Sequence, residues 1–314
     1  METLATVEWW KGEESRWGLL PPPLRQLAGQ LPQQTRARVE EVRLRLGRPL
    51  SVVEGGKERS LPLWRDRLIQ ENDLQWVLEK AGQGSVHTVL EQLRQGYLSV
   101  EGGHRIGVCG SVAVKEGSLV NYRTFSSLTL RFAHQMKGLA EPLLPQLHEE
   151  GRLLSTLIFA PPGGGKTTLL RDLIRCASDG VGLPPHRVGV ADERGELCGM
   201  SQGIPQNEVG YHTDVLDGCP KALALLMLLR GMNPQVLAMD EITDPRDLAA
   251  MEEVAGCGVT LLATAHGATP GEVRLRPLYR DLLASRIFRR FVWIDQEGDR
   301  RRYRVMTAKE LMGV

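Results

Sequence analysis

The hydrophobic positions of this chain follow two different patterns, and the change between them falls just before residue 153. After it, short runs that are almost continuously apolar alternate with segments whose apolar residues recur every three or four positions. The first pattern is typical of strands buried on both faces of a parallel sheet, and the second of amphipathic helices. The predicted order is strand 153–159, helix 167–177, strand 187–191, helix 220–230, strand 235–239, helix 246–256 and strand 259–263. This alternation predicts an α/β fold with a predominantly parallel sheet, which ends in a hairpin of residues 289–295 and 301–306.

The preceding part of the chain has a mixed pattern, in which strands and helices are not regularly alternated. Strands are predicted at 39–46, 50–53 and 128–132, helices at 68–81 and 88–95, and a glycine-rich hairpin region at 98–114. This pattern predicts a smaller α+β domain over 1–145, followed by the α/β domain over 146–314. Residues 1–35 contain Trp9, Trp10 and Trp17 and are expected to form an arm that either covers the protein's own core or anchors a partner.

The strongest chemical signal is the sequence Ala-Pro-Pro-Gly-Gly-Gly-Lys-Thr at 160–167. It follows a predicted strand and opens a predicted helix, which is the context that makes G-x-x-x-x-G-K-[ST] a phosphate-binding loop. Ala160 replaces the first Gly, so this position tests whether a small residue suffices there. Glycines at 163–165 let backbone N–H groups converge on phosphate oxygens, and the helix N-terminus adds further donors. Lys166 would then reach the β- and γ-phosphates of ATP, and the Thr167 hydroxyl would ligate Mg²⁺.

Two carboxylates follow the predicted strand 235–239. Asp240 and Glu241 stand where parallel strands of such a sheet end and where ligands bind. Asp240 is predicted to hold a Mg²⁺-bound water, and Glu241 to orient and deprotonate the attacking water. Downstream of a phosphate-binding loop, this interpretation is favoured over a solvated acidic turn.

Two further groups are predicted at the same edge of the sheet. The segment 192–196, Asp-Glu-Arg-Gly-Glu, offers acids that could supply the water-activating base, or it is an ordinary acidic loop. His266, at the end of the strand that starts at 259, would sense the γ-phosphate or transfer a proton, unless it is a surface histidine. Segment 201–217 is predicted to be a long polar loop. Arg105, Arg123 and Arg131 of the first domain are each candidates for an arginine finger on the nucleotide, and the sequence does not choose among them.

Composition narrows the class of protein only slightly. With 314 residues and a formal net charge of +1, the chain has no global field that would attract nucleic acid or an anionic membrane, so no nucleic-acid partner is expected. Only 8 of the 39 basic residues are Lys, an excess of Arg that suits interfaces and phosphate sites or reflects composition bias. The five cysteines are scattered without a C-x-x-C pair, which argues against a disulfide framework and for a reducing compartment. No signal peptide is expected, and the longest apolar run, 222–229, is far too short to span a membrane.

Four segments together carry a resemblance to a known family: Pro-Pro-Gly-Gly-Gly-Lys-Thr-Thr-Leu-Leu-Arg-Asp at 161–172, Asp-Glu-Arg-Gly-Glu at 192–196, Met-Asp-Glu-Ile-Thr-Asp at 239–244 and Ala-Thr-Ala-His-Gly at 263–267. The chain resembles the stage III sporulation protein AA family of endospore-forming bacteria, and the stretches 102–107 and 125–131 fit it as well. That family is similar to the type II and type IV secretion ATPases, which are hexameric RecA-like motors. The resemblance implies a RecA-like P-loop NTPase core behind the smaller N-terminal domain.

Carried over to this chain, the resemblance assigns a phosphate loop of eight residues: Pro161, Pro162, Gly163, Gly164, Gly165, Lys166, Thr167 and Thr168. Glu196 corresponds to the catalytic glutamate of the secretion ATPases. Those enzymes usually have Gly-Glu where this chain has Asp240-Glu241, so both Glu196 and Glu241 remain candidates for the general base, with a slight preference for Glu241.

The resemblance also implies a biological role. It predicts an ATPase of the mother-cell cytoplasm that forms a homo-oligomeric ring, with hexamers expected, and uses ATP and Mg²⁺. It would drive a membrane-embedded sporulation complex and could lie peripherally at the membrane around the forespore. Two alternatives remain open: a nucleic-acid-dependent ATPase, since RecA-like folds also translocate DNA, and an assembly scaffold that binds ATP without hydrolysing it.

Overall fold

The computed structural model describes residues 13–60, 64–82, 86–100, 102–115, 118–132, 136–201, 203–267, 269–297 and 300–312. These residues form two compact units, each with its own core. The N-terminal unit contains the described residues between 13 and 132 together with those of 199–206. The C-terminal unit contains residues 136–198 and the described residues from 207 to 312. Trp9 and Trp10 of the predicted arm lie outside the described residues, whereas Trp17 is buried in the core of the N-terminal unit.

The N-terminal unit is built on a six-stranded antiparallel sheet of order β3-β2-β1-β6-β5-β4. Its strands are β1 (Glu41–Arg45), β2 (Ser51–Glu54), β3 (Lys57–Arg59), β4 (Tyr97–Val100), β5 (His104–Lys115) and β6 (Ser118–Arg131). The sequence predicted only 128–132 for the last strand. Its first ten residues extend as a ribbon that pairs with β5, and most of their side chains are exposed or half-buried, so no apolar run marks them.

Helices complete the N-terminal unit: α1 (Glu13–Gly18), α2 (Pro22–Ala28), α3 (Gln33–Arg38), α4 (Glu71–Ala81) and α5 (Val86–Arg94). Helix α4 begins later than predicted, because Gln70 and Asp73 form a reciprocal capping box that ends the extended segment before it. Asn72, another residue type that often caps helices, lies inside the helix.

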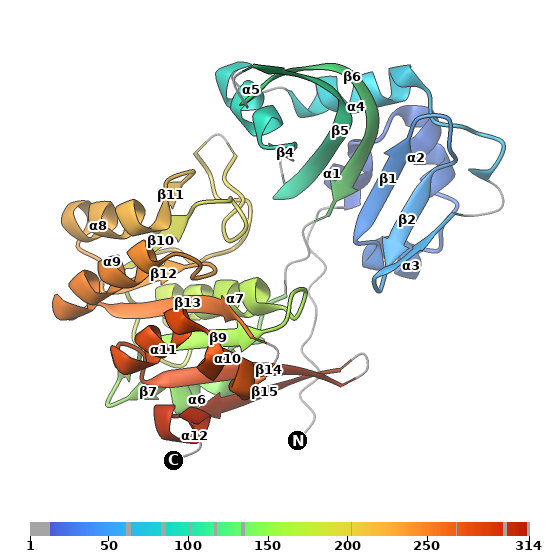
Figure 1. Cartoon of the computed structure of the whole chain (residues 1–314). Helices are drawn as coiled ribbons and strands as arrows, with labels where there is room; N and C mark the ends of the chain where they lie inside the picture. Colours follow the sequence, from blue (N-terminus) through green and yellow to red (C-terminus); the bar gives the residue numbers. More distant parts are fainter. Residues whose placement is uncertain are drawn as a thin grey trace. The chain divides into compact units, whose positions relative to one another are not determined.

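The C-terminal unit contains a seven-stranded sheet of order β11-β10-β12-β13-β9-β14-β15 (Figure 1). All neighbours are parallel except β14 and β15, which form the predicted antiparallel hairpin at the end of the chain. The strands are β9 (Thr156–Ala160), β10 (Val188–Asp192), β11 (Thr213–Asp217), β12 (Val236–Met239), β13 (Thr260–His266), β14 (Arg290–Glu297) and β15 (Arg300–Met306). A short pair, β7 (His148–Glu149) and β8 (Arg152–Leu153), precedes them. The predicted α/β class with a predominantly parallel sheet is therefore confirmed.

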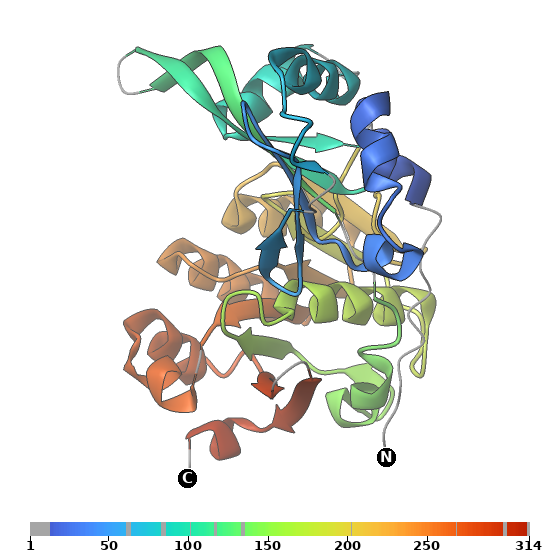
Figure 2. The ribbon, with the colours of Figure 1, turned by 90° about the vertical axis from the view of Figure 1, so that its right-hand side faces the viewer.

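Helices cover both faces of this sheet, which explains why its central strands are buried throughout. Helix α7 (Lys166–Asp179) packs against β13, β9 and β10 on one face and lies alongside the sheet in the second view (Figure 2). The other face is covered by α8 (Lys221–Met232), α9 (Pro245–Gly256), α10 (Pro270–Leu275), α11 (Pro277–Ala284) and α12 (Ala308–Met312). The turn η2 (Glu141–Leu143) and α6 (Leu144–Leu147) precede the first strands.

The prediction of one continuous loop over 201–217 is wrong at its end, where Thr213–Asp217 forms β11. This strand pairs in parallel with β10 at the edge of the sheet. Because none of its side chains is fully buried, its sequence lacks the apolar run that marks the central strands. Among the described residues, no helix combines the length and apolar character needed to cross a membrane.

Candidate functional site

The glycine-rich segment forms a tight loop between the end of β9 at Ala160 and the start of α7 at Lys166. Gly163 and Gly165 have φ angles of 71° and 92°, which favour residues without a Cβ atom. A Cβ atom on Gly164 would lie 2.7 Å from the Ala160 Cβ and 2.9 Å from the Pro161 carbonyl oxygen. Ala160 therefore packs directly against the loop. The Ala160 side chain fits there because residue 164 is glycine and has no Cβ atom.

Lys166 and Thr167 are the first residues of α7, and both side chains turn toward the edge of the sheet. The Lys166 ammonium donates to the carbonyl oxygens of Ala160 and Pro161 at 3.3 and 3.4 Å. Thr167 Oγ1 donates to Asp240 Oδ2 at 2.9 Å, which joins the loop to the end of β12. Burial lowers the pKa of Lys166, and the carboxylates of Glu241 and Asp240 oppose this shift.

Asp240 is held from three directions by groups that donate to it. Besides Thr167, it accepts from Thr264 Oγ1 at 2.5 Å and from the Glu241 backbone N–H at 3.0 Å. The register explains this contact: Met239 pairs with Ala263, so the next residues along the two strands, Asp240 and Thr264, are neighbours. The carboxylate is fixed in one orientation beside the glycine-rich loop.

Glu241, His266 and Lys166 form a continuous chain of hydrogen bonds. His266 Nε2 lies 2.8 Å from Glu241 Oε1, and His266 Nδ1 lies 2.9 Å from Lys166 Nζ. Because an ammonium group only donates and a carboxylate only accepts, this arrangement requires Nδ1 to accept and Nε2 to carry the proton. Glu241 adopts a φ of 32°, an unusual value for a residue with a side chain, and its backbone N–H donates to Thr264 Oγ1 at 2.8 Å.

The acids of segment 192–196 separate into distinct roles. Asp192 is buried, and its two carboxylate oxygens accept backbone N–H groups of Glu196, Leu197 and Cys198. Burial raises the pKa of Asp192, and these three donors oppose the shift. Asp192 thus shapes the loop, whereas the Glu196 side chain is exposed.

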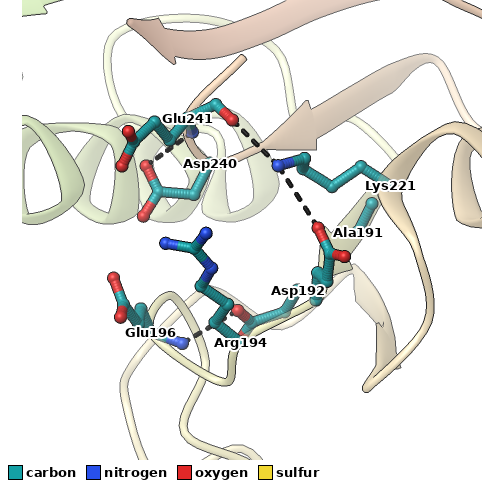
Figure 3. Close-up of a pocket in the computed structure, with 8 residues that line it drawn as sticks. Ala191, Asp192, Arg194, Glu196, Lys221, Asp240 and Glu241 are labelled. Atoms are coloured by element: carbon teal, nitrogen blue, oxygen red, sulfur yellow. Dashed lines mark hydrogen bonds and ion pairs between the residues drawn. The ribbon is translucent and has the colours of Figure 1, made fainter. Parts of the chain in front are cut away.

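A hollow beside the loop collects these groups. It is lined by Ala191, Asp192, Glu193, Arg194, Glu196, Lys221, Asp240 and Glu241 (Figure 3). In this view the Arg194 guanidinium points into the hollow, between the Glu196 and Asp240 side chains. Acids that follow β10 and β12 therefore line one shared space at the edge of the sheet.

Two residues of the site, Thr264 and Lys221, were given no individual role from the sequence. Thr264 is fully buried yet polar, and a threonine inside an apolar strand could have signalled it. Lys221 is the first residue of α8, although the helix dipole disfavours a cation there. The reason for its position is that Lys221 Nζ donates to the Glu241 carbonyl oxygen at 2.9 Å and lies 3.2 Å from Glu193 Oε2.

The donor set beside the loop fits a magnesium ion that arrives with a nucleotide. The Thr167 hydroxyl and the Asp240 carboxylate are adjacent hard oxygen donors, and Mg²⁺ is usually held by few protein ligands together with waters and substrate phosphates. Within the described ranges, no group of three or more His, Cys, Asp or Glu side chains is arranged to hold a metal ion. A metal at this site would therefore depend on phosphate oxygens for part of its coordination.

The three candidate finger arginines all belong to the N-terminal unit. The Arg105 guanidinium lies 3.6 Å from the centre of the Tyr97 ring, and Arg131 Nε donates to Glu41 Oε1 at 2.8 Å. Arg123 is exposed on β6. Their assignment as fingers stays a prediction.

A parallel sheet covered on both faces, with a glycine-rich loop leading from a central strand into a helix, defines a P-loop NTPase fold. The chain belongs to the family described as sporulation stage III, protein AA, whose profile matches residues 13–310. It is 38% identical to stage III sporulation protein AA of Bacillus subtilis (strain 168) over 275 residues, which cover 87% of this chain and 88% of that protein. The predicted family membership is confirmed.

Solved structures support the fold. The Legionella pneumophila ATPase DotB matches with a TM-score of 0.57 at 14% identity, covering 88% of this chain and 79% of that one. The pilus retraction motor PilT with bound ADP matches with a TM-score of 0.58 at 17% identity, and the match covers 86% of this chain and 79% of the PilT chain. At these identities the likeness is one of fold alone.

Proposed function

We propose that this chain is an ATPase of endospore formation, which hydrolyses ATP to ADP and phosphate. One observation carries the proposal: Lys166 and Thr167 of the glycine-rich loop meet Asp240 and the Glu241–His266 pair, which come from two other strands. A loop that only bound phosphate would not need a carboxylate and a histidine aligned beside its lysine. Membership of a sporulation family supports the biological setting.

The hydrogen bonds indicate how the residues would act on ATP. Lys166 would exchange its carbonyl and histidine partners for β- and γ-phosphate oxygens, which are stronger acceptors. Thr167 and Asp240 would hold Mg²⁺, which neutralises phosphate charge. Glu241 would accept a proton from the attacking water, while His266 Nε2–H keeps its carboxylate oriented.

The first test compares the purified full-length wild type with Lys166→Ala and with Lys309→Ala, a control at an exposed lysine of α12. We expect Mg²⁺-dependent phosphate release from the wild type and the control, and loss of nucleotide binding in Lys166→Ala. A Lys166→Ala protein with full turnover would contradict the proposal.

The second test identifies the base. Glu241→Gln preserves the acceptor for His266 and removes the basic group, so we expect kcat to fall by about 100-fold or more while ATP binding remains. Glu196→Gln is expected to have a smaller effect, because the Glu196 side chain is exposed, whereas Glu241 Oε1 lies 2.8 Å from His266 Nε2 beside the loop lysine. The reverse order would assign the base to Glu196. If both variants complement sporulation fully, the chain is an ATP-binding scaffold instead.

We further propose that the ATPase works as a homo-oligomeric ring, with a hexamer expected, that energises a membrane-embedded secretion-like or channel complex from the mother-cell cytoplasm. The support is family membership and the fold shared with DotB and PilT, one described as an ATPase and the other as a motor. Turnover per chain should then rise with protein concentration as the mass measured by light scattering rises. Constant turnover on a monomer would argue against a ring, and steeply salt-dependent stimulation by DNA would favour a nucleic-acid-dependent ATPase.

A further inference from the structure

The terminal hairpin brings a guanidinium group onto the phosphate loop. A Cβ atom built on Gly165 would lie 3.1 Å from Cζ and Nη1 of Arg301 and 3.3 Å from its Nε. The arginine side chain therefore occupies the space that any side chain at 165 would need. The guanidinium lies against a glycine-rich loop whose backbone N–H groups and helix N-terminus are suited to receive anions.

The sheet register explains how Arg301 reaches the loop. Arg301 and Tyr303 are two residues apart on β15, so their side chains lie on the same face of the sheet. Arg302 lies between them and points to the opposite face, because successive side chains of a strand alternate. Only one of these two adjacent arginines is therefore directed at the loop.

The strand order separates Arg301 from the acids that surround the γ-phosphate end. Asp240, Glu196 and His266 follow or end β12, β10 and β13, which lie on one side of β9, whereas β14 and β15 lie on its other side. In a loop of this kind, the backbone near Gly165 cradles the α- and β-phosphates, and the lysine reaches the β- and γ-phosphates. Arg301 thus stands beside the part of the nucleotide that is not transferred.

We propose that Arg301 is a nucleotide-binding residue that contacts the α- and β-phosphates of ADP and ATP from the terminal hairpin. This inference rests on the proposed ATPase function. The guanidinium offers a planar fork of N–H donors that matches phosphate oxygens. It closes the loop on the side opposite to the catalytic acids and does not take part in the hydrolytic step.

The test measures dissociation constants of ADP and of Mg·ATP, together with kcat at saturating ATP, for the full-length chain. We expect Arg301→Ala to weaken both nucleotides to a similar degree, by about tenfold, as is usual for the loss of one charge-assisted hydrogen bond at an exposed site, with kcat unchanged. Arg302→Ala is the matched control and should bind both nucleotides like the wild type. Arg301→Lys keeps the charge without the fork and should lie between the wild type and Arg301→Ala.

Several outcomes would overturn the inference. Arg301→Ala could bind both nucleotides as tightly as the wild type, or more tightly if the arginine merely blocks the loop. If Arg301→Ala lost affinity for ATP but not for ADP, or lowered kcat alone, Arg301 would contact the γ-phosphate and not the α- and β-phosphates. Lys166→Ala in the same assay separates the two proposals: if the wild type binds nucleotide and Lys166→Ala does not, an unaffected Arg301→Ala refutes this inference alone.

Discussion

The hydroxyl group of Thr264 provides the sharpest test of the site, because it can be removed without changing the shape of the side chain. Thr264 is completely buried, donates to Asp240 Oδ1 at 2.5 Å and accepts the Glu241 backbone N–H at 2.8 Å. Thr264→Val keeps the branched volume and removes both hydrogen bonds.

The expected loss of stability follows from the partners left behind. The bond to the Asp240 carboxylate is charge-assisted, a type that contributes about 1.5–3 kcal/mol. The Glu241 N–H keeps a second acceptor, Asp240 Oδ1 at 3.0 Å. Losing its hydrogen bond to Thr264 therefore adds only a few tenths of a kcal/mol to the destabilisation. We therefore expect Thr264→Val to lower the free energy of unfolding by about 2–3 kcal/mol. This corresponds to a decrease in the melting temperature of about 4–12 °C for a unit of this size.

Calorimetry and ATP turnover measured on the same samples test this reasoning. Thr264→Ser is the control, because it keeps the hydroxyl and loses one methyl group, at a cost of about 1 kcal/mol. We expect Thr264→Ser to retain turnover and Thr264→Val to lose at least about tenfold in kcat, since Asp240 and Glu241 are no longer held in position. If Thr264→Val is as stable and as active as Thr264→Ser, the hydroxyl does not organise the site.

Three further predictions address the loop and its acidic neighbours. Gly164→Ala should reduce nucleotide affinity by more than about tenfold in titration calorimetry while the melting temperature changes little, because a Cβ would lie 2.9 Å from a backbone oxygen of the loop; normal affinity would contradict this. Asp192→Asn should lower the free energy of unfolding, measured in urea, by about 2–4 kcal/mol, because an amide cannot accept from all three backbone N–H groups. An unchanged midpoint of urea unfolding would show that these N–H groups do not need the carboxylate. Burial, and then the charge of Asp192, raise the pKa of Asp217 from 3.8 to about 6. Ionising Asp217 therefore costs stability as the pH rises through this interval, so Asp217→Asn should raise the melting temperature at about pH 8 and leave it unchanged at about pH 4; equal melting temperatures at pH 8 would refute the shift.

The phosphate loop could be predicted from sequence because all of its determinants are local. The strand before it, the glycines and the helix after it lie within about two dozen consecutive residues, and each has its own signature. Asp240 and Glu241 could be predicted for a related reason: parallel strands end at one edge, so a strand that ends in acids delivers them there. The apolar runs that mark the central strands likewise allowed the parallel sheet to be predicted from the sequence.

Contacts that depend on the sheet order could not be predicted in this way. Arg301 lies against Gly165 only because β14 pairs with β9 and β15 follows it, which brings together residues far apart in the chain. Two further elements were missed, the edge strand β11 and the first ten residues of β6. Most of their side chains are exposed or half-buried, so no apolar run marks them. Buried polar roles, such as that of Thr264, need the pairing register before they can be inferred.

Two acids at this edge of the sheet are held by other groups of the chain, so Glu196 and Glu241 remain the candidates for the general base. Asp192 accepts three backbone N–H groups, and Asp240 accepts the hydroxyl groups of Thr167 and Thr264. Glu241 instead has a carboxylate oriented by His266 and a backbone in the left-handed region, a conformation that costs about 1–2 kcal/mol and persists only where its surroundings enforce it. Those surroundings are Thr264 and Lys221, which bind its N–H and its carbonyl oxygen. Strain that is enforced by buried partners and that points a carboxylate at the phosphate loop favours Glu241 as the base.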